Sequence, residues 1–196
     1  MKKTFFETIR VVDGEPLNLK YHQKRYESVL ASLDVKKFKK FKMYIDPPKY
    51  GLYRCKIIYD AKDLSVEFFE YKKRDIKSLK VVFDDEISYK YKSTSREHLD
   101  KLFAKRGLCD DVLIVKNSFI TDTTIANVAF YKDGLWYSPK KPLLCGTTRA
   151  RLVDEKKLIL KDIKIKDLAE YSGLALMNAM IDFDIITLEN LKDTIC

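Results

Sequence analysis

Glycine and proline are scarce in this chain, with 6 and 5 residues among 196, so long flexible linkers are not expected. No apolar run reaches the roughly 18 residues that a membrane-spanning helix needs. The N-terminal stretch becomes charged at Glu7 and Arg10, before it could form the apolar segment of a secretory signal. These absences predict a compact cytoplasmic protein, built as one domain or as two small ones.

The cysteines and histidines are too few and too scattered for a metal site. The chain has no Cys-x-x-Cys pair, and His22 and His98 lie far from every cysteine. This spacing argues against zinc, and we expect no bound metal. In a cytoplasmic protein the thiols are expected to be reduced, and we interpret Cys55, Cys109 and Cys145 as small buried apolar residues.

The net charge is +9, from 38 Lys and Arg against 29 Asp and Glu. Such a charge can serve nucleic-acid binding, but here the lysines are spread along the chain and no RNA- or DNA-binding motif is present. The densest cluster, residues 36–42, carries Phe38 and Phe41 three positions apart, which predicts an amphipathic helix with a solvated lysine face. A small anionic ligand is the better match to the positive field.

The apolar periodicity of residues 1–88 predicts a small α+β lobe. Asn18 is expected to cap its helix. The helix is expected at 20–33 and strands at 5–12, 16–19, 53–59, 64–71 and 79–83. The last three strands are expected to form an antiparallel meander, because no helix-length insert separates them.

Residues 89–196 predict a second lobe of mixed β and α structure. Ser95 is expected to cap its first helix and Gly107 to end it. Helices are expected at 96–106, 148–155 and 166–171, and strands at 112–116, 119–121, 128–131, 135–137, 158–165, 174–177 and 185–188. Composition changes little along the chain, so the boundary at 88–89 rests on where the meander ends.

Three chemical groups that could bind one cofactor occur one after another along the sequence. Lys92 offers an amine, Asp122 a carboxylate, and Gly146-Thr147-Thr148 a turn that leads into a helix. An amine can bond an aldehyde, a carboxylate can keep a ring nitrogen protonated, and the N–H groups of such a turn can bind a phosphate. The guanidinium of Arg25 can donate two further hydrogen bonds to such a phosphate. Taken singly, these residues also suit a surface lysine, a turn aspartate, a helix start and a solvated arginine.

Taken together, the motifs resemble those of the class IV aminotransferases, the fold-type IV pyridoxal phosphate enzymes. That family includes branched-chain and D-amino-acid aminotransferases and 4-amino-4-deoxychorismate lyase. The motifs that carry the resemblance over most of the chain are Phe6–Gly14, Tyr21–Arg25, Lys92–Arg96, Phe119–Asn127, Gly146–Arg149 and Met177–Met180.

The resemblance implies the α+β fold of D-amino-acid aminotransferase, with two lobes, pyridoxal 5'-phosphate as cofactor, and a homodimer. It implies that Lys92 is the catalytic lysine that carries the cofactor. The cofactor-binding residues that it implies are Arg25, Asp122, Asn127, Thr147, Thr148, Asn178 and Ala179.

The chain also departs from the family pattern. The family acid is usually glutamate, so Asp122 is one methylene shorter, and the ring must lie closer or a water must bridge. The chain begins where the first hairpin of the family would already have passed. The loop that helps the lyases bind substrate carboxylates is cut to residues 60–63.

Lys90 competes with Lys92 for the covalent role, because two residues apart on a strand they would face the same side. We prefer Lys92, since Arg96 four residues later reproduces the Lys-x-x-x-Arg spacing of the lyase.

The Lys-x-x-x-Arg and Asn-Ala-Met segments favour a lyase that converts 4-amino-4-deoxychorismate to p-aminobenzoate and pyruvate, as in folate biosynthesis. Arg10, Arg54 and Lys56 lie on expected strands near the presumed cleft, and they are candidates for binding the substrate carboxylates. The alternative is an amino acid aminotransferase of the branched-chain or D-amino-acid type. In both cases the partner is a small anionic amino-acid-like substrate, with no nucleic acid and no membrane.

Overall fold

The computed structural model describes residues 3–196, which form two compact units. Unit 1 holds the chain up to Lys73 together with Tyr91–Ser95, and unit 2 holds Arg74–Lys90 and Arg96–Cys196. The chain therefore passes into unit 2, returns to unit 1 for one short segment, and leaves again. The boundary expected at 88–89 lies within this passage, whereas residues 74–88 pack with unit 2.

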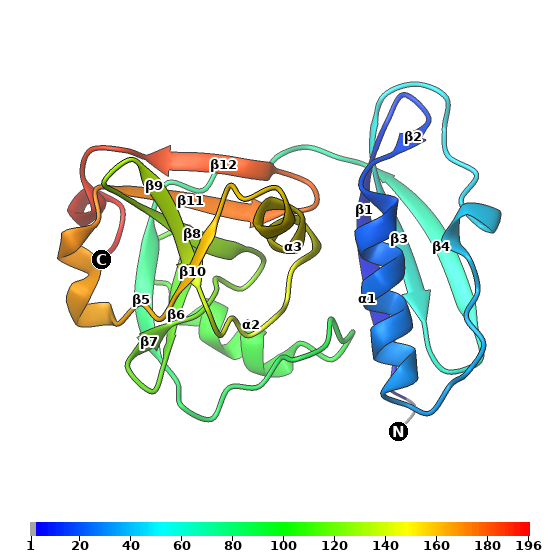
Figure 1. Cartoon of the computed structure of the whole chain (residues 1–196), viewed down its shortest axis with the longest axis horizontal. Helices are drawn as coiled ribbons and strands as arrows, with labels where there is room; N and C mark the ends of the chain where they lie inside the picture. Colours follow the sequence, from blue (N-terminus) through cyan, green and yellow to red (C-terminus); the bar gives the residue numbers. More distant parts are fainter. Residues whose placement is uncertain (1–2) are drawn as a thin grey trace. The chain divides into compact units, whose positions relative to one another are not determined.

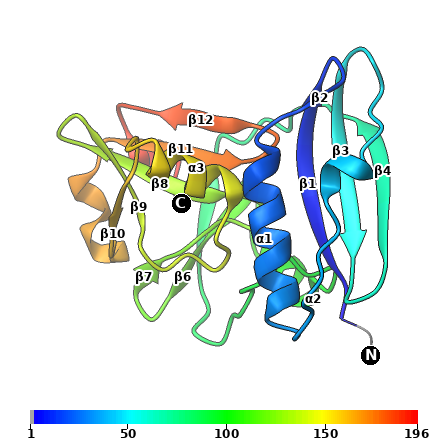
Figure 2. The ribbon, with the colours of Figure 1, turned by 45° about the vertical axis from the view of Figure 1, so that its right-hand side comes forward.

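Unit 1 is an antiparallel sheet in the order β2-β1-β3-β4, with one face covered by a helix (Figure 1). Its elements are β1 (Phe5–Val12), β2 (Glu15–Pro16), α1 (Leu19–Ala31), β3 (Leu52–Tyr59) and β4 (Leu64–Glu70). Side chains along β1 alternate strictly between buried and partly exposed, as a half-buried strand requires. Figure 2 shows α1 lying along one face of the sheet. The buried side chains of β1 share one core with those of α1.

The core of unit 1 forms where α1 meets this sheet. Ile9 and Val11 of β1 pack there with Val29 and Leu30 of α1. The expected helix face is thus present, but the expected cap is not. Asn18 adopts a left-handed conformation with φ 55°, and its side chain makes no capping hydrogen bond.

The lysine-rich segment 36–42 is not the amphipathic helix that its phenylalanine spacing predicted. Residues 35–40 are irregular, and only a 3-10 turn, η1 (Phe41–Met43), follows. The side chain of Gln23 on α1 donates to the Lys39 carbonyl at 3.0 Å and accepts from the Phe41 N–H at 2.9 Å. These tertiary bonds satisfy backbone groups that a helix would otherwise pair, and they hold Phe41 in the core.

The returning segment Tyr91–Ser95 adds to the free edge of β1. The Phe6 N–H donates to the Lys92 carbonyl at 2.9 Å, and the Thr94 N–H donates to the Thr4 carbonyl at 3.0 Å. β2 pairs with the same strand farther along, at Val11 and Val12. Backbone hydrogen bonds therefore fix Lys92 beside the beginning of β1.

Unit 2 contains two sheets, in the orders β10-β9-β8-β11-β12 and β5-β6-β7 (Figure 1). Apolar residues of both, including Leu113, Phe130 and Leu176, share one core. The strands are β5 (Leu79–Phe83), β6 (Asp111–Lys116), β7 (Phe119–Ile120), β8 (Asn127–Lys132), β9 (Leu135–Pro139), β10 (Ile159–Lys161), β11 (Gly173–Asn178) and β12 (Asp182–Thr187). The helical segments are α2 (Glu97–Ala104), α3 (Thr147–Asp154), and the 3-10 turns η2 (Ile165–Glu170) and η3 (Leu191–Asp193).

Three predictions about these elements are wrong in detail. β5 does not join the meander with β3 and β4; it pairs in parallel with β6, because the chain crosses over through α2 between them. Ser95 does not cap α2, which begins after Arg96 without a side-chain capping bond. The strand expected at 158–165 is shortened to β10, and only its last residue, Ile165, belongs to η2.

The cysteines also depart in part from expectation. Cys55 is buried on β3, as predicted. Cys109 is only half-buried, and Cys145 is exposed, because both lie in loops rather than in the core. The prediction of three buried thiols is therefore wrong for two of them.

Candidate active site

A buried carboxylate organises the helix-facing side of the unit 1 sheet. Glu7 is fully buried and accepts from the Arg25 guanidinium in a fork, from Nε to Oε1 at 2.8 Å and from Nη2 to Oε2 at 2.6 Å. The ring of His22 completes the cluster, with Nδ1 2.7 Å from Oε2 of Glu7. The His-x-x-Arg spacing thus brings both α1 side chains to one carboxylate on β1.

Burial and neighbouring groups determine which side chains of this cluster are charged. Burial by itself raises the pKa of Glu7, but the charge of Arg25 and the hydrogen bonds from His22 and Arg25 outweigh it and lower the pKa to about 2. Burial lowers the pKa of His22, so the ring is neutral at pH 7 and its Nδ1–H donates to Glu7. The charged pair is therefore Glu7 with Arg25, and the carboxylate fixes how the guanidinium lies.

Replacing Glu7 with glutamine should cost roughly 3–5 kcal/mol of unfolding free energy at pH 7, because Arg25 loses its buried counter-charge. In the wild type, the lowered pKa of Glu7 contributes stability that is complete above pH 4.5 and is lost as pH falls towards 2, about 3 kcal/mol in all. Urea denaturation across this pH range measures both effects. Glu70→Gln, at an exposed position of β4, is the matched control and should change stability by less than about 0.5 kcal/mol.

Lys92, the predicted catalytic lysine, is half-buried in unit 1. Its Nζ lies 4.6 Å from the centroid of the Phe6 ring, a cation–π contact. Phe6 belongs to the set of β1 side chains that point away from α1, opposite to Glu7.

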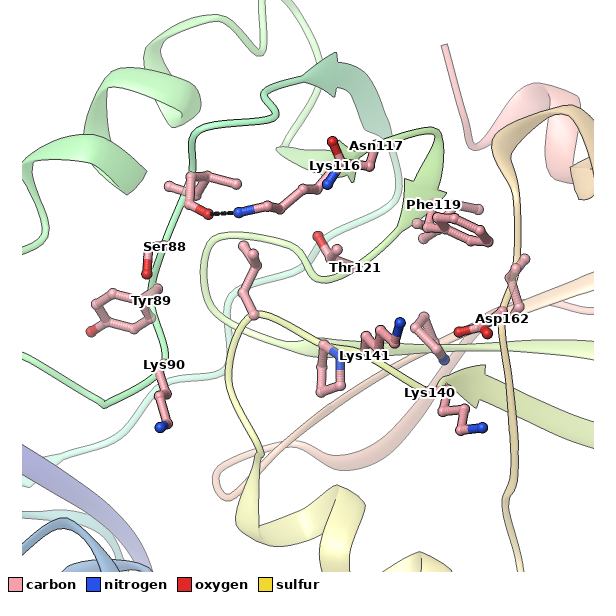
Figure 3. Close-up of a pocket in the computed structure, with 16 residues that line it drawn as sticks. Ser88, Tyr89, Lys90, Lys116, Asn117, Phe119, Thr121, Lys140, Lys141 and Asp162 are labelled. Atoms are coloured by element: carbon pink, nitrogen blue, oxygen red, sulfur yellow. Dashed lines mark hydrogen bonds between the residues drawn. The ribbon is translucent and has the colours of Figure 1, made fainter. Parts of the chain in front are cut away.

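Lys90, its competitor, belongs to unit 2, and residues 84–92 form no strand, so the expectation that the two lysines face the same side of a strand is wrong. Lys90 lines a cavity of about 400 Å³ together with Lys116, Lys140 and Lys141 (Figure 3). The Nζ of Lys116 donates there to the Ile87 carbonyl at 2.6 Å. This cavity contains none of the predicted cofactor residues.

Arg10, Arg54 and Lys56, the candidates for substrate binding, gather on the face of the unit 1 sheet that points away from α1. Arg10 lies directly opposite Arg54 in the β1–β3 register, and Thr8 lies opposite Lys56. The Arg54 guanidinium stacks 5.0 Å from the ring centroid of Phe69 on β4. Like charges placed opposite one another across strands repel, so an anion bound at this face would relieve that repulsion.

Asp122, the predicted ring acid, is buried in unit 2 just before β8. Its Oδ1 accepts from the Asn127 side-chain amide at 2.7 Å, and its Oδ2 accepts from the Leu144 N–H at 2.9 Å. Burial raises the pKa of Asp122 to about 6, although these donors and the charge of Arg149 act in the opposite direction. The Leu143 N–H is a third donor to this carboxylate, which has about four acceptor sites, so the group can still accept from a ring N–H.

Asn127 links this acid to the predicted phosphate turn. Its amide also donates to the Leu144 carbonyl at 2.8 Å, and its Oδ1 would lie 1.9 Å from a Cβ placed on Gly146. Only glycine therefore fits at the start of α3. Thr147 and Thr148 follow as buried residues of the first turn, where helical N–H groups have no intrahelical acceptor.

Asn178 is the last residue of β11, and Ala179 begins the turn that leads to β12. The Oδ1 of Asn178 accepts from the N–H of Met180 and of Ile181, at 2.9 and 3.1 Å. Its amide reaches the Ile125 carbonyl in the loop after Asp122, at 3.3 Å. Asn178 therefore braces that loop within unit 2.

Sequence reasoning assigned no role to Glu7 or Asp111, which hold these groups in place, and it used Arg96 only for its spacing to Lys92. Glu7 occupies a buried position of an alternating strand. Glutamate is rarely buried without a partner, so this position in the pattern could have identified it as a functional residue. Asp111, which is fully buried, accepts from the Thr124 hydroxyl at 2.7 Å. Arg96 donates to the Thr124 carbonyl at 2.9 Å, so Thr124 anchors the loop that carries Asp122.

The donor set fits a phosphorylated pyridine aldehyde. Unit 1 offers the Lys92 amine and the fixed guanidinium of Arg25. Unit 2 offers a buried carboxylate at Asp122 and a glycine-led helix start at which a side chain would collide with Asn127. An amine, an acid and an anion-binding helix start are the three functions that such a group requires.

Comparison with known families decides the class. The family model for amino-transferase class IV matches residues 69–187, more than half of the chain. The chain belongs to the class IV aminotransferase family. It is therefore a pyridoxal-phosphate-dependent enzyme, and the predicted fold-type IV class is confirmed by solved structures.

Relatives cover nearly the whole chain. An uncharacterised protein of Haemophilus influenzae is 35% identical over 181 residues, which are 89% of this chain and 96% of the relative. A crystal structure from Haemophilus somnus 129pt, described as a "putative 4-amino-4-deoxychorismate lyase", is 34% identical with a TM-score of 0.86, and the match covers 92% of this chain and 97% of that one.

A more distant structure supports the fold alone. The branched-chain amino acid aminotransferase of Escherichia coli has a TM-score of 0.75 at 11% identity, over 96% of this chain and 79% of its own. Among the described residues of the present chain, no helix is both long and apolar enough to cross a membrane.

Proposed function

We propose that this enzyme is a 4-amino-4-deoxychorismate lyase that releases p-aminobenzoate and pyruvate, and so supplies folate biosynthesis. The observation that carries the proposal is the resemblance over 92% of the chain to a structure described as such a lyase. A "Putative aminodeoxychorismate lyase" of Schizosaccharomyces pombe adds to it, at 37% identity over 76 residues, which are 34% of this chain and 33% of that one. The Lys92–Arg96 spacing agrees with this class.

In this proposal, the Lys92 amine would hold the cofactor and would also act as the base. Pyridoxal phosphate, when bound, would withdraw electrons from the carbon that bears the substrate amine. The Lys92 amine would take the proton from that carbon as the bond from the ring to the enolpyruvyl oxygen breaks, and the departing enolpyruvate would take up a proton to become pyruvate. The ring becomes aromatic, which makes the elimination strongly favourable.

The other groups act by charge and position. Asp122 stabilises the positive charge on the ring nitrogen, held in place by Asn127 and the Leu144 N–H. Arg25 and the N–H groups of Thr147 and Thr148 bind the phosphate, because a guanidinium and a helix start both favour an anion.

The basic face of Arg10, Arg54 and Lys56 is proposed to bind the two substrate carboxylates. Arg54→Gln should then raise KM for the substrate by roughly 10- to 100-fold, the loss of one charged hydrogen bond, with a smaller change in kcat. Lys42→Gln, at an exposed position of η1, serves as the matched control. Equal KM values for wild type and Arg54→Gln would remove Arg54 from the substrate site.

A direct assay separates the lyase from an aminotransferase. The purified enzyme with pyridoxal phosphate is supplied with 4-amino-4-deoxychorismate, and p-aminobenzoate and pyruvate are measured without any keto acid. We expect the two products in equal amounts. Glutamate formed from 2-oxoglutarate and an amino acid, with no p-aminobenzoate in the first assay, would instead establish a branched-chain or D-amino-acid aminotransferase.

By the same resemblance we propose a homodimer. Sedimentation equilibrium should give about twice the 23.0 kDa mass of one chain. A single-chain mass across micromolar concentrations would contradict this part of the proposal.

A further inference from the structure

Two cysteines of unit 2, far apart in the sequence, meet in the structure. The sulfur atoms of Cys109 and Cys196 lie 3.3 Å apart, although 87 positions separate them along the chain. A disulfide bond is about 2.05 Å long, so the two sulfurs need to approach by only a little more than 1 Å to bond. The other two thiols differ in placement: Cys55 is buried on β3 of unit 1, and Cys145 is an exposed residue just before α3.

Backbone hydrogen bonds hold both cysteines at the beginning of β5. On one side, the Asp110 N–H donates to the Ser78 carbonyl at 3.0 Å, and the Asp110 carboxylate accepts from the N–H groups of Lys77 and Ser78. These bonds fix the loop that contains Cys109.

On the other side, the last residues of the chain add to β5 as a short parallel segment (Figure 1). The Leu79 N–H donates to the Thr194 carbonyl at 2.7 Å, and the Cys196 N–H donates to the Leu79 carbonyl at 2.9 Å. The meeting of the sulfurs is therefore imposed by the fold on both sides and does not depend on two mobile side chains.

We propose that Cys109 and Cys196 form a redox modification site, at which an oxidant of the disulfide class converts the two thiols to an intrachain disulfide. Cys196 is the exposed member and Cys109 the half-buried one. Burial and the neighbouring Cys196 sulfur raise the pKa of Cys109, so Cys196 is the thiol that reacts first.

The reaction balances with oxidised glutathione as the oxidant. Cys196, as the thiolate, attacks one glutathione sulfur and releases the first reduced glutathione, which takes up the proton. Cys109 then attacks the mixed disulfide at the Cys196 sulfur, and the second reduced glutathione leaves with the proton of Cys109. The protein gives up two electrons and two protons, and one oxidised glutathione becomes two thiols.

The bond would close a ring that contains Asp122, Asn127 and the Gly146–Thr148 turn. Joining residues so far apart restricts the unfolded chain strongly, and the stabilisation grows with the length of the closed ring. The melting temperature of the oxidised holoenzyme should therefore exceed that of the reduced form by roughly 5–10 °C.

The test uses the full-length holoenzyme, incubated with oxidised glutathione and then unfolded in acid. We expect the thiols of Cys109 and Cys196 to be lost, and a non-reducing peptide map to show the Cys109 peptide joined to the Cys196 peptide. Dithiothreitol should restore four thiols and the lower melting temperature. Cys145→Ser is the matched control, and should still form the crosslink and show the same thermal shift.

Cys109→Ser and Cys196→Ser each remove one partner and should abolish the linked peptide and the thermal shift. The proposal is overturned if four thiols survive the treatment, if the bond joins two chains, or if the mapped bond contains Cys145. It is also overturned if Cys196 stops at the glutathione adduct without passing to Cys109. None of these readouts depends on which reaction the enzyme catalyses.

Discussion

Lys92→Arg should lower kcat by at least roughly 10³-fold and abolish covalent attachment of the cofactor. Arginine keeps the positive charge beside Phe6, but its guanidinium stays protonated and cannot condense with an aldehyde at neutral pH. The variant therefore removes the proposed nucleophile and the proposed proton acceptor together, while the electrostatics around His22 are preserved.

Borohydride reduction of the holoenzyme, followed by peptide mapping, provides the measurement. In the wild type, the pyridoxyl group should be found on Lys92. In Lys92→Arg, no modified peptide should remain, and the visible absorption of the bound cofactor should be replaced by that of the free aldehyde.

Lys90→Arg is the matched control, because it applies the same exchange two residues away. Lys90 lines the lysine-rich cavity of unit 2, so its replacement should leave both activity and labelling close to wild type. A pyridoxyl group on residue 90, or loss of labelling in Lys90→Arg alone, would transfer the covalent role from Lys92 to Lys90.

With the role proposed for Asp122, Asp122→Asn should lower kcat by roughly 10²–10³-fold, because the ring nitrogen would lose the negative charge that keeps it protonated. Asp122→Glu retains the charge and restores the residue usual in this family, so its loss should be much smaller. Steady-state kinetics of the two variants make the comparison. A kcat for Asp122→Asn within tenfold of wild type would mean that another group serves the ring nitrogen.

The same residue should leave a signature in the stability of the cofactor-free protein. Because burial raises the pKa of Asp122 from 3.8 to about 6, the charged carboxylate costs stability. The cost is absent below pH 3.8, grows as pH rises, and is complete above pH 6, where it amounts to about 3 kcal/mol.

Wild-type stability should therefore fall between pH 3.8 and about 6 relative to Asp122→Asn, whose side chain does not titrate. Both proteins share the acid window of Glu7, in which stability changes in the opposite direction, so the difference between them isolates Asp122. Parallel pH curves for the two proteins would contradict the raised pKa of Asp122.

The local sequence pattern was enough to predict most of the helices and strands. The patterns along residues 5–12 and 53–59 predicted β1 and β3, and the apolar face of residues 20–33 predicted α1, because a half-buried strand and a surface helix each impose their own period. Turn signals such as Asp133-Gly134, both with positive φ, marked the hairpin between β8 and β9 in the same way.

Long-range pairing could not be predicted from such patterns. The β5 strand could have extended the meander, and its parallel pairing with β6 follows from the crossover through α2. The lysine-rich segment had a helical spacing, but the Gln23 side chain and a core position for Phe41 offered its backbone better partners.

By itself, the sequence determined the family, the order of the amine, the acid and the glycine-led turn, and the periods of the main strands and helices, since these depend on neighbouring residues. Only the tertiary structure decided that Glu7 fixes Arg25, that Lys90 and Lys92 belong to different units, and that Cys109 meets Cys196. Each of these three outcomes depends on residues that are distant along the chain. Tertiary packing sets how far apart they lie in space, and no local sequence pattern encodes that spatial distance.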